Sequence, residues 1–181
     1  MAHIHTAPWQ HDWAATTVVA RRFGSELKIL LHKHKKLGRF LPPGGHIELD
    51  ERPWQAALRE LHEEAGYRAE QLAVLQWPNP RLPQSNEYWR DPQPLDVSSV
   101  VYGGNSPDHI HDNLLFGFFT DQDPADSPAP GESQVFRWIG QSELSAIDCD
   151  AYGRAQIALV FDGFDKMQRT RLDASGVPLA D

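Results

Sequence analysis

The sequence contains one cysteine, Cys149, among its 181 residues, so no disulfide can form within the chain. A chain without disulfides is typical of a reducing compartment. No apolar run approaches the roughly 18 residues of a membrane-spanning helix. The first residues also lack the cationic start and the apolar core of a secretory signal. We therefore expect a cytoplasmic protein without a membrane partner.

Positive charge is scarce, with 17 Lys and Arg residues against 25 Asp and Glu residues and a formal net charge of -8. An acidic chain has no general attraction for a nucleic-acid backbone, and no Lys- and Arg-rich helix is visible in the sequence. These absences disfavour a long nucleic acid as partner. They favour a small phosphorylated ligand held by a metal ion, in a chain long enough for one substantial core.

The most informative segment is residues 45–67, where three carboxylates are spaced at helical intervals. Glu60, Glu63 and Glu64 stand at positions i, i+3 and i+4, so a helix brings them to one face. Such a cluster of like charges is costly unless a cation neutralises it, and carboxylate oxygens are hard ligands that suit Mg²⁺ or Mn²⁺. The spacing therefore predicts a metal site.

The residues around these carboxylates predict a helix over residues 53–65. Pro53 fits the first helical position, where its missing N–H is not needed, and Gly66 fits the left-handed position that ends a helix. Arg59 is placed to pair with Glu63 one turn later. An apolar stripe is formed by Trp54, Ala57, Leu58, Leu61 and Ala65. We expect this stripe to dock on a sheet, so that the carboxylates face away from the core.

Residues 42–45, two prolines and two glycines, precede the helix and let main-chain groups approach a metal or phosphate closely. The whole segment follows the pattern G-x5-E-x7-R-E-U-x-E-E-x-G-U, where U is apolar, through Gly45, Glu51, Arg59, Glu60, Leu61, Glu63, Glu64, Gly66 and Tyr67. A solvated acidic helix would explain the charges but not the glycines and the spacing. The chain thus resembles the Nudix hydrolases, and only the Tyr at the last position departs slightly from the usual aliphatic residue.

This resemblance implies an α/β fold, the Nudix-type α/β/α sandwich with a mixed central sheet. The single domain would span residues 14–165, with an N-terminal extension at 1–13 and a C-terminal tail at 166–181. Homodimers are common among similar proteins, although no residue here predicts one. The sequence itself adds a hairpin from residues 16–20 and 27–31, and Ser142 as the cap of a short helix. Further strands are expected at 39–41, 69–77, 97–102, 113–120 and 135–139, loops at 78–94 and 121–131, and a final helix at 151–167.

The resemblance also implies a reaction, the hydrolysis of a phosphoric anhydride bond in a nucleoside diphosphate linked to another group X. Such hydrolysis needs charge neutralisation on the phosphate, an in-line water and a base. By similarity, Mg²⁺, or Mn²⁺ in its place, would be bound by Glu60, Glu63, Glu64 and the Gly44 carbonyl. Arg59 would orient the carboxylates and Glu51 would support the loop or the outer metal shell. Which glutamate acts as base differs among Nudix proteins and stays open.

Several other residues are candidates for substrate binding. Glu132, in a loop before an expected strand, is a candidate for a further acid, and His46 follows the Gly-Gly pair. His109 and His111 project to one face of a strand and could contact phosphate or hold a metal. The stretch that includes them resembles a poorly characterised bacterial branch of the family in which such histidines lie near the pocket. Solvent-exposed or supporting roles stay open for each.

The basic cluster at residues 32–36 could guide an anionic substrate or form an exposed hairpin end. Aromatic residues that could stack a nucleobase, or instead pin a loop to the core, are Trp77, Tyr88, Trp89 and Tyr102. Alternative functions are a non-catalytic nucleotide-binding sensor and a hydrolase of a non-nucleotide diphosphate. RNA decapping is disfavoured by the negative charge. Isomerases that share this scaffold have a catalytic cysteine near the site. Isomerase chemistry is disfavoured here because Cys149 lies far beyond the motif.

Overall fold

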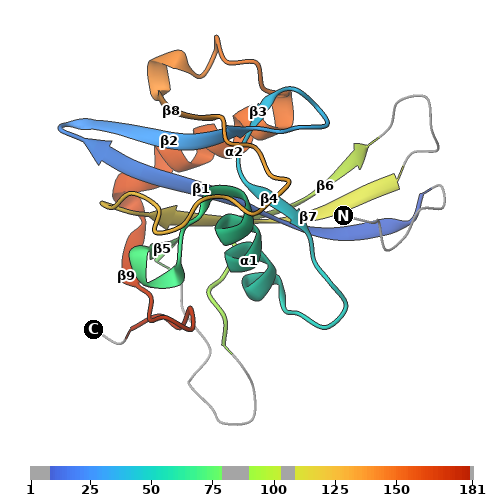
Figure 1. Ribbon diagram of the computed structural model, residues 1–181, viewed down its shortest axis with the longest axis horizontal. Helices are drawn as coiled ribbons and strands as arrows, with labels where there is room; N and C mark the ends of the chain where they lie inside the picture. Colours follow the sequence, from blue (N-terminus) through green and yellow to red (C-terminus); the bar gives the residue numbers. More distant parts are fainter. Residues whose placement is uncertain (1–8, 79–89, 103–108, 180–181) are drawn as a thin grey trace.

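A computed structural model of the chain describes residues 9–78, 90–102 and 109–179. Within these residues nine strands form one mixed sheet, with the main order β3-β2-β1-β7-β5-β9 (Figure 1). The strands are β1 (His11–Phe23), β2 (Glu26–Lys33), β3 (Phe40–Leu41), β4 (Gly44–His46), β5 (Ala73–Gln76), β6 (Asp96–Tyr102), β7 (His109–Phe119), β8 (Phe136–Gly140) and β9 (Gln168–Arg171). No helix in the described ranges is both long and apolar enough to cross a membrane.

Strand β1 organises the sheet because it pairs with three other strands along its length. Its second half forms the predicted antiparallel hairpin with β2, and its first half pairs with β4. Along its other edge β1 runs parallel to β7, from His11 opposite Ile110 to Ala20 opposite Phe119. Strand β7 in turn pairs with β6 and β5. Four of the other seven strands, β2, β4, β5 and β6, therefore pair with one of these two central strands.

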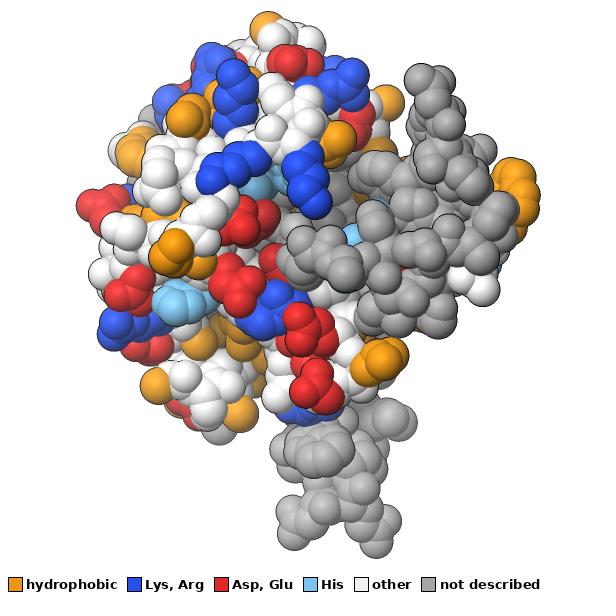
Figure 2. Space-filling model, turned by 45° about the vertical axis from the view of Figure 1, so that its right-hand side comes forward, with side chains coloured by type: hydrophobic (Ala, Val, Ile, Leu, Met, Phe, Trp, Pro, Cys, Tyr) orange, Lys and Arg blue, Asp and Glu red, His pale blue; other side chains and the backbone are white. Residues whose placement is uncertain are grey.

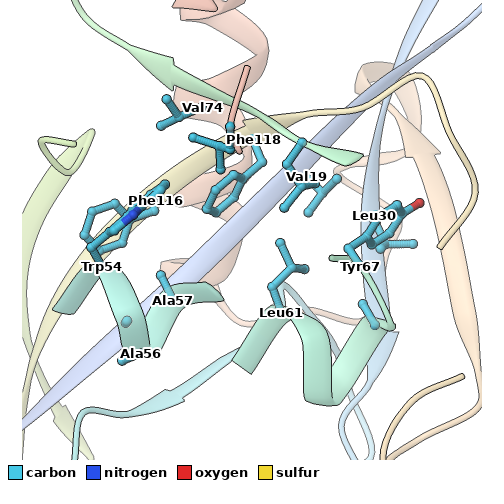
Figure 3. Close-up of a cluster of buried hydrophobic side chains, with 14 of the residues drawn as sticks. Val19, Leu30, Trp54, Ala56, Ala57, Leu61, Tyr67, Val74, Phe116 and Phe118 are labelled. Atoms are coloured by element: carbon cyan, nitrogen blue, oxygen red, sulfur yellow. The ribbon is translucent and has the colours of Figure 1, made fainter. Parts of the chain in front are cut away.

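Helix α1 (Pro53–Ala65) covers one face of the sheet, with the bounds that the sequence predicts. Gly66 ends it in the left-handed conformation, at φ 73°. Figure 3 shows side chains of this helix pointing toward the sheet, where Trp54 and Leu61 lie near Phe116, Phe118 and Val19. Full burial of a side chain such as that of Leu61 contributes about 1.5–3 kcal/mol. The apolar stripe thus holds the acidic helix on the sheet.

Helix α2 (Ala151–Gly163) covers the opposite face and continues into a 3-10 turn at Phe164–Lys166. The Asp150 carboxylate caps its start by accepting a hydrogen bond from the Gly153 N–H at 2.7 Å. Ile157 and Val160 pack against Val18 and other buried residues of the sheet. With a helix on each side of a mixed sheet (Figure 1), the predicted α/β/α sandwich is confirmed.

Some local predictions differ from the structure. The strand expected at 69–77 begins with a 3-10 turn, Ala69–Gln71, before β5. The prediction that Ser142 caps a short helix is wrong. Gln141–Glu143 is a single 3-10 turn preceded by Gly140, because the Glu143 carboxylate accepts the Gly140 N–H at 2.9 Å. The sheet also extends beyond 14–165, since β1 begins at His11 and β9 pairs with β5.

Candidate active site

The three carboxylates of α1 lie in the second half of the helix, where Glu64 contacts Gly44 at the start of β4. Glu60 and Glu64 are 1% and 6% exposed, whereas the Glu63 side chain is 42% exposed. The expectation that the carboxylates face away from the core fits the exposed Glu63, whereas Glu60 and Glu64 are buried. Polar partners contact both of these buried carboxylates, Arg59 at Glu60 and the Gly44 N–H at Glu64.

Arg59 holds the cluster together. Its guanidinium donates to both oxygens of Glu51, at 2.6 and 3.1 Å, and to Glu60 at 2.8 Å. It also contacts Glu63 at 3.2 Å, as the helical spacing predicts, and donates to the His46 carbonyl at 3.0 Å. The hydrogen bond with Glu51 is the main reason that the Arg59 pKa is raised above its usual value. Arg59 and Glu51 therefore tie the helix to the strand and loop before it.

Glu64 contacts the start of strand β4 rather than Arg59. The Gly44 N–H donates to Glu64 Oε2 at 2.8 Å, and His32 Nε2 lies 3.4 Å from the same oxygen. His32 is 1% exposed, and burial lowers its pKa to about 4, so the imidazole is neutral at neutral pH. The interpretation of residues 32–36 as an exposed hairpin end is thus wrong for His32. The place of His32 in the sequence, three residues before Lys35 in a basic cluster, did not predict its contact with Glu64.

The electrostatics of this site favour a bound cation. Burial raises the pKa of Glu60 to about 7, although its hydrogen bond with Arg59 opposes the rise. Burial likewise raises the pKa of Glu64 to about 8, against the opposing hydrogen bond from Gly44. Buried carboxylates are costly to ionise unless a positive charge compensates them. The hard oxygen donors of Glu60, Glu63 and Glu64 fit Mg²⁺ or Mn²⁺.

A cleft of about 450 Å³ opens beside Glu64. Glu132 lines it, as do Lys35 and Lys36 from the turn after β2, and Lys35 Nζ donates to the Gly131 carbonyl. On the face drawn in Figure 2, acidic side chains gather near the middle with basic side chains beside them. A cleft that combines carboxylates with lysines has the charge pattern to hold a metal ion and a phosphorylated molecule together.

Two of the three histidines predicted as substrate ligands lie along this cleft. His46 and His111 line it, and their Nε2 atoms are 3.2 Å apart. The carboxylate of Asp12, a residue that the sequence did not single out, lies 3.9 Å from His46 Nε2. Within the described part of the chain, these three residues form a group that could hold a metal ion. The side chain of His109 lies outside the described residues.

Two further sequence hypotheses concern aromatic residues and Cys149. Trp77 donates its indole N–H to the Leu95 carbonyl at 3.1 Å, which fits the loop-pinning role. Tyr88, Trp89 and the side chain of Tyr102 lie outside the described residues. Cys149 is buried, and burial raises the pKa of its thiol to about 11. A thiol that stays protonated at neutral pH is a poor nucleophile, which further disfavours isomerase chemistry.

Comparisons with known proteins agree with this fold and motif. A family model described as the NUDIX domain matches residues 11–159. Two curated relatives match parts of the chain. The asymmetrical bis(5'-nucleosyl)-tetraphosphatase of Caenorhabditis elegans is 33% identical over 84 residues, which are 42% of this chain and 61% of the relative. A probable DHNTP pyrophosphohydrolase of Lactococcus lactis subsp. cremoris (strain MG1363) is 40% identical over 50 residues, 28% of this chain and 30% of the relative.

Both alignments cover less than two thirds of the relatives' own lengths. Among solved structures, a hydrolase of the NUDIX family from Clostridium perfringens superimposes with a TM-score of 0.65 at 23% identity, over 84% of this chain and 97% of that one. At this identity the superposition shows the fold alone. The family match covers most of the chain, and two of the motif residues, Gly45 and Glu64, line the cleft. The chain therefore belongs to the NUDIX family.

Proposed function

We propose that this chain hydrolyses a phosphoric anhydride bond in a small nucleoside diphosphate linked to another group X, with Mg²⁺ as its cofactor and Mn²⁺ as a substitute. The observation that carries this proposal is a pair of buried carboxylates on one helix, Glu60 and Glu64, of which Glu64 lines a cleft together with Lys35 and Lys36. Burial of two ionised acids on one helix costs free energy, and a divalent cation bound to them would offset this cost. The lysines then supply attraction for the phosphates.

Each motif residue has a role in this proposal that follows from its contacts. Glu60, Glu63 and Glu64 would hold the ion together with the Gly44 carbonyl. The bound ion would neutralise phosphate charge and lower the pKa of a coordinated water. Arg59 and Glu51 position the carboxylates through their paired hydrogen bonds. The Gly44 N–H orients Glu64 directly.

The acceptor of the water proton must itself reach water. Glu63, with its side chain 42% exposed, meets this condition, and Glu132, which lines the cleft, is the second candidate. Glu60, at 1% exposed, does not. The relatives named for cleavage of nucleotide anhydrides support a nucleotide as substrate. The identity of X depends on pocket residues for which the motif carries no information.

The test is product analysis by chromatography over a panel of nucleotides, with Mg²⁺ and then with Mn²⁺. The panel contains nucleoside triphosphates, ADP-ribose, nucleotide sugars, dinucleoside polyphosphates and dinucleotide cofactors. Glu63→Gln is the inactive comparison, and Glu70→Gln, an exposed glutamate in the 3-10 turn after α1, is the matched control. We expect cleavage of one class by the natural chain and by Glu70→Gln, and at least about 100-fold slower turnover by Glu63→Gln.

The same panel separates this proposal from its alternatives. Cleavage that is equally fast in a folded Glu63→Gln variant contradicts the role of the carboxylates. Binding of a nucleotide without turnover indicates a sensor. A non-nucleotide diphosphate is assayed beside the panel. Its cleavage, when no nucleotide is bound or cleaved, would make non-nucleotide diphosphates the substrate class instead.

A further inference from the structure

Three strands bring Asp12, His46 and His111 together on one face of the sheet. Asp12 in β1 pairs directly with His111 in β7, and His46 in β4 pairs with Ala14, two residues after Asp12. Paired residues share a face, and so do residues two apart on one strand. The register therefore places all three side chains on the same side, although they come from segments far apart in the sequence.

The ligand atoms of these side chains are already close enough for a shared ion. The Nε2 atoms of His46 and His111 are 3.2 Å apart, His46 Nε2 is 3.9 Å from Asp12 Oδ2, and all three ligand atoms lie within 4.8 Å of one another. With metal–ligand bonds of about 2.0–2.2 Å, two ligands on a tetrahedral ion are about 3.3–3.6 Å apart. Movements of these three ligand atoms by a few tenths of an ångström up to about 1 Å would bring them to the distances that a shared ion requires.

We infer that Asp12, His46 and His111 form a second metal site, separate from the carboxylates of α1, for a borderline divalent transition metal such as Zn²⁺. Two imidazole nitrogens and one carboxylate oxygen suit Zn²⁺ far better than Mg²⁺, which prefers oxygen ligands alone. Asp12 is 2% exposed, and its carboxylate lies beside the two imidazole rings as the third ligand. Binding of this ion does not depend on the hydrolytic activity proposed above.

The position of this second site indicates what the ion would contact. His46 and His111 line the cleft that Glu64 also lines, while Asp12 lies buried beneath them. Three protein ligands leave a fourth position for water or substrate, as in catalytic zinc sites. That position would be open to an oxygen atom of the molecule in the cleft. The Arg59 hydrogen bond to the His46 carbonyl also links this site to the acidic helix.

The test measures metal binding directly, without an activity readout. The full chain, stripped with EDTA, is dialysed against Zn²⁺ in excess Mg²⁺, which fills the carboxylate site. We expect one Zn²⁺ per chain in the natural protein and in Glu63→Gln. The affinity for Zn²⁺ should fall at least about 100-fold in His111→Asn and in Asp12→Asn. Loss of even an outer-shell partner of a zinc ligand lowers metal affinity about 10- to 100-fold. His62→Asn, an exposed histidine paired with Asp126, is the matched control.

Co²⁺ absorption supplies a second measurement, since imidazole ligation gives visible bands that should disappear in His111→Asn. Thermal melting verifies that each variant is folded, and His46→Asn replaces any variant that is not. The inference is overturned if the natural chain binds no stoichiometric Zn²⁺, or if folded His111→Asn and Asp12→Asn bind it as tightly as the natural chain. Loss of Zn²⁺ binding in Glu63→Gln would also overturn it, because the ion would then belong to the carboxylates.

Discussion

Glu64→Gln should stabilise the metal-free protein at pH 8 while it weakens metal binding. The Glu64 side chain is almost fully buried, and its pKa rises from 4.5 to about 8, chiefly because burial removes water from the charged form. Each unit of pKa difference corresponds to about 1.4 kcal/mol, so the cost of ionised Glu64 has an upper bound of ~5 kcal/mol. Relaxation around the charge and coupling to Glu60 reduce this value, and we expect a gain of about 1–3 kcal/mol.

The sign of the pH dependence follows from proton linkage. A carboxyl group whose pKa is higher in the folded than in the unfolded state binds more protons when folded, so the free energy of unfolding falls as pH rises. For Glu64 this loss begins near 4.5 and is complete just above pH 8. The variant, whose amide can still accept the Gly44 N–H, should therefore match the natural chain near pH 4.5 and exceed it at pH 8.

Urea unfolding in EDTA, from pH 4.5 to pH 8.5, measures this difference as a shift in midpoint at constant slope. Mg²⁺ at about 100 times its Kd should then add about 2.7 kcal/mol to the natural chain and much less to Glu64→Gln. Glu70→Gln is the control and should stay within about 0.5 kcal/mol of the natural chain throughout. A Glu64→Gln variant that is less stable than the natural chain at pH 8 in EDTA would refute the reasoning, since the ionised carboxylate would then be stabilising.

The remaining predictions concern three other positions. Arg59→Lys should lower kcat at least about 10-fold and weaken Mg²⁺ binding, because an ammonium group cannot reproduce the two hydrogen bonds with Glu51. Unchanged kinetics would contradict the proposal that Arg59 positions the carboxylates. Gly66→Ala should lower the free energy of unfolding by about 1–3 kcal/mol in urea, since φ is 73° and a Cβ would meet the Asp126 carbonyl; Ala at exposed Gly24, also at positive φ but in open space, should cost less. Cys149→Ala should leave kcat within about twofold of the natural value. A fall in kcat as large as that of Glu63→Gln would instead indicate that the Cys149 thiol takes part in catalysis.

Local sequence patterns determined much of this protein. Pro53 and Gly66 bound α1, and the helical spacing placed Arg59 beside Glu63, because these effects act within a few residues of the chain. The hairpin of β1 and β2 follows from strand-forming runs on either side of a short turn. The motif on α1 was likewise readable, since its chemistry lies in one contiguous segment.

Tertiary structure alone decided the features that join distant segments. The burial of Glu64 depends on the Gly44 N–H and on His32, and neither the pKa of the acid nor that of the imidazole can be read from residue type. Asp12 joins His46 and His111 only because β1 pairs with β4 along one edge and with β7 along the other. Strand register is a property of the assembled sheet, so no periodicity in the sequence could reveal this cluster.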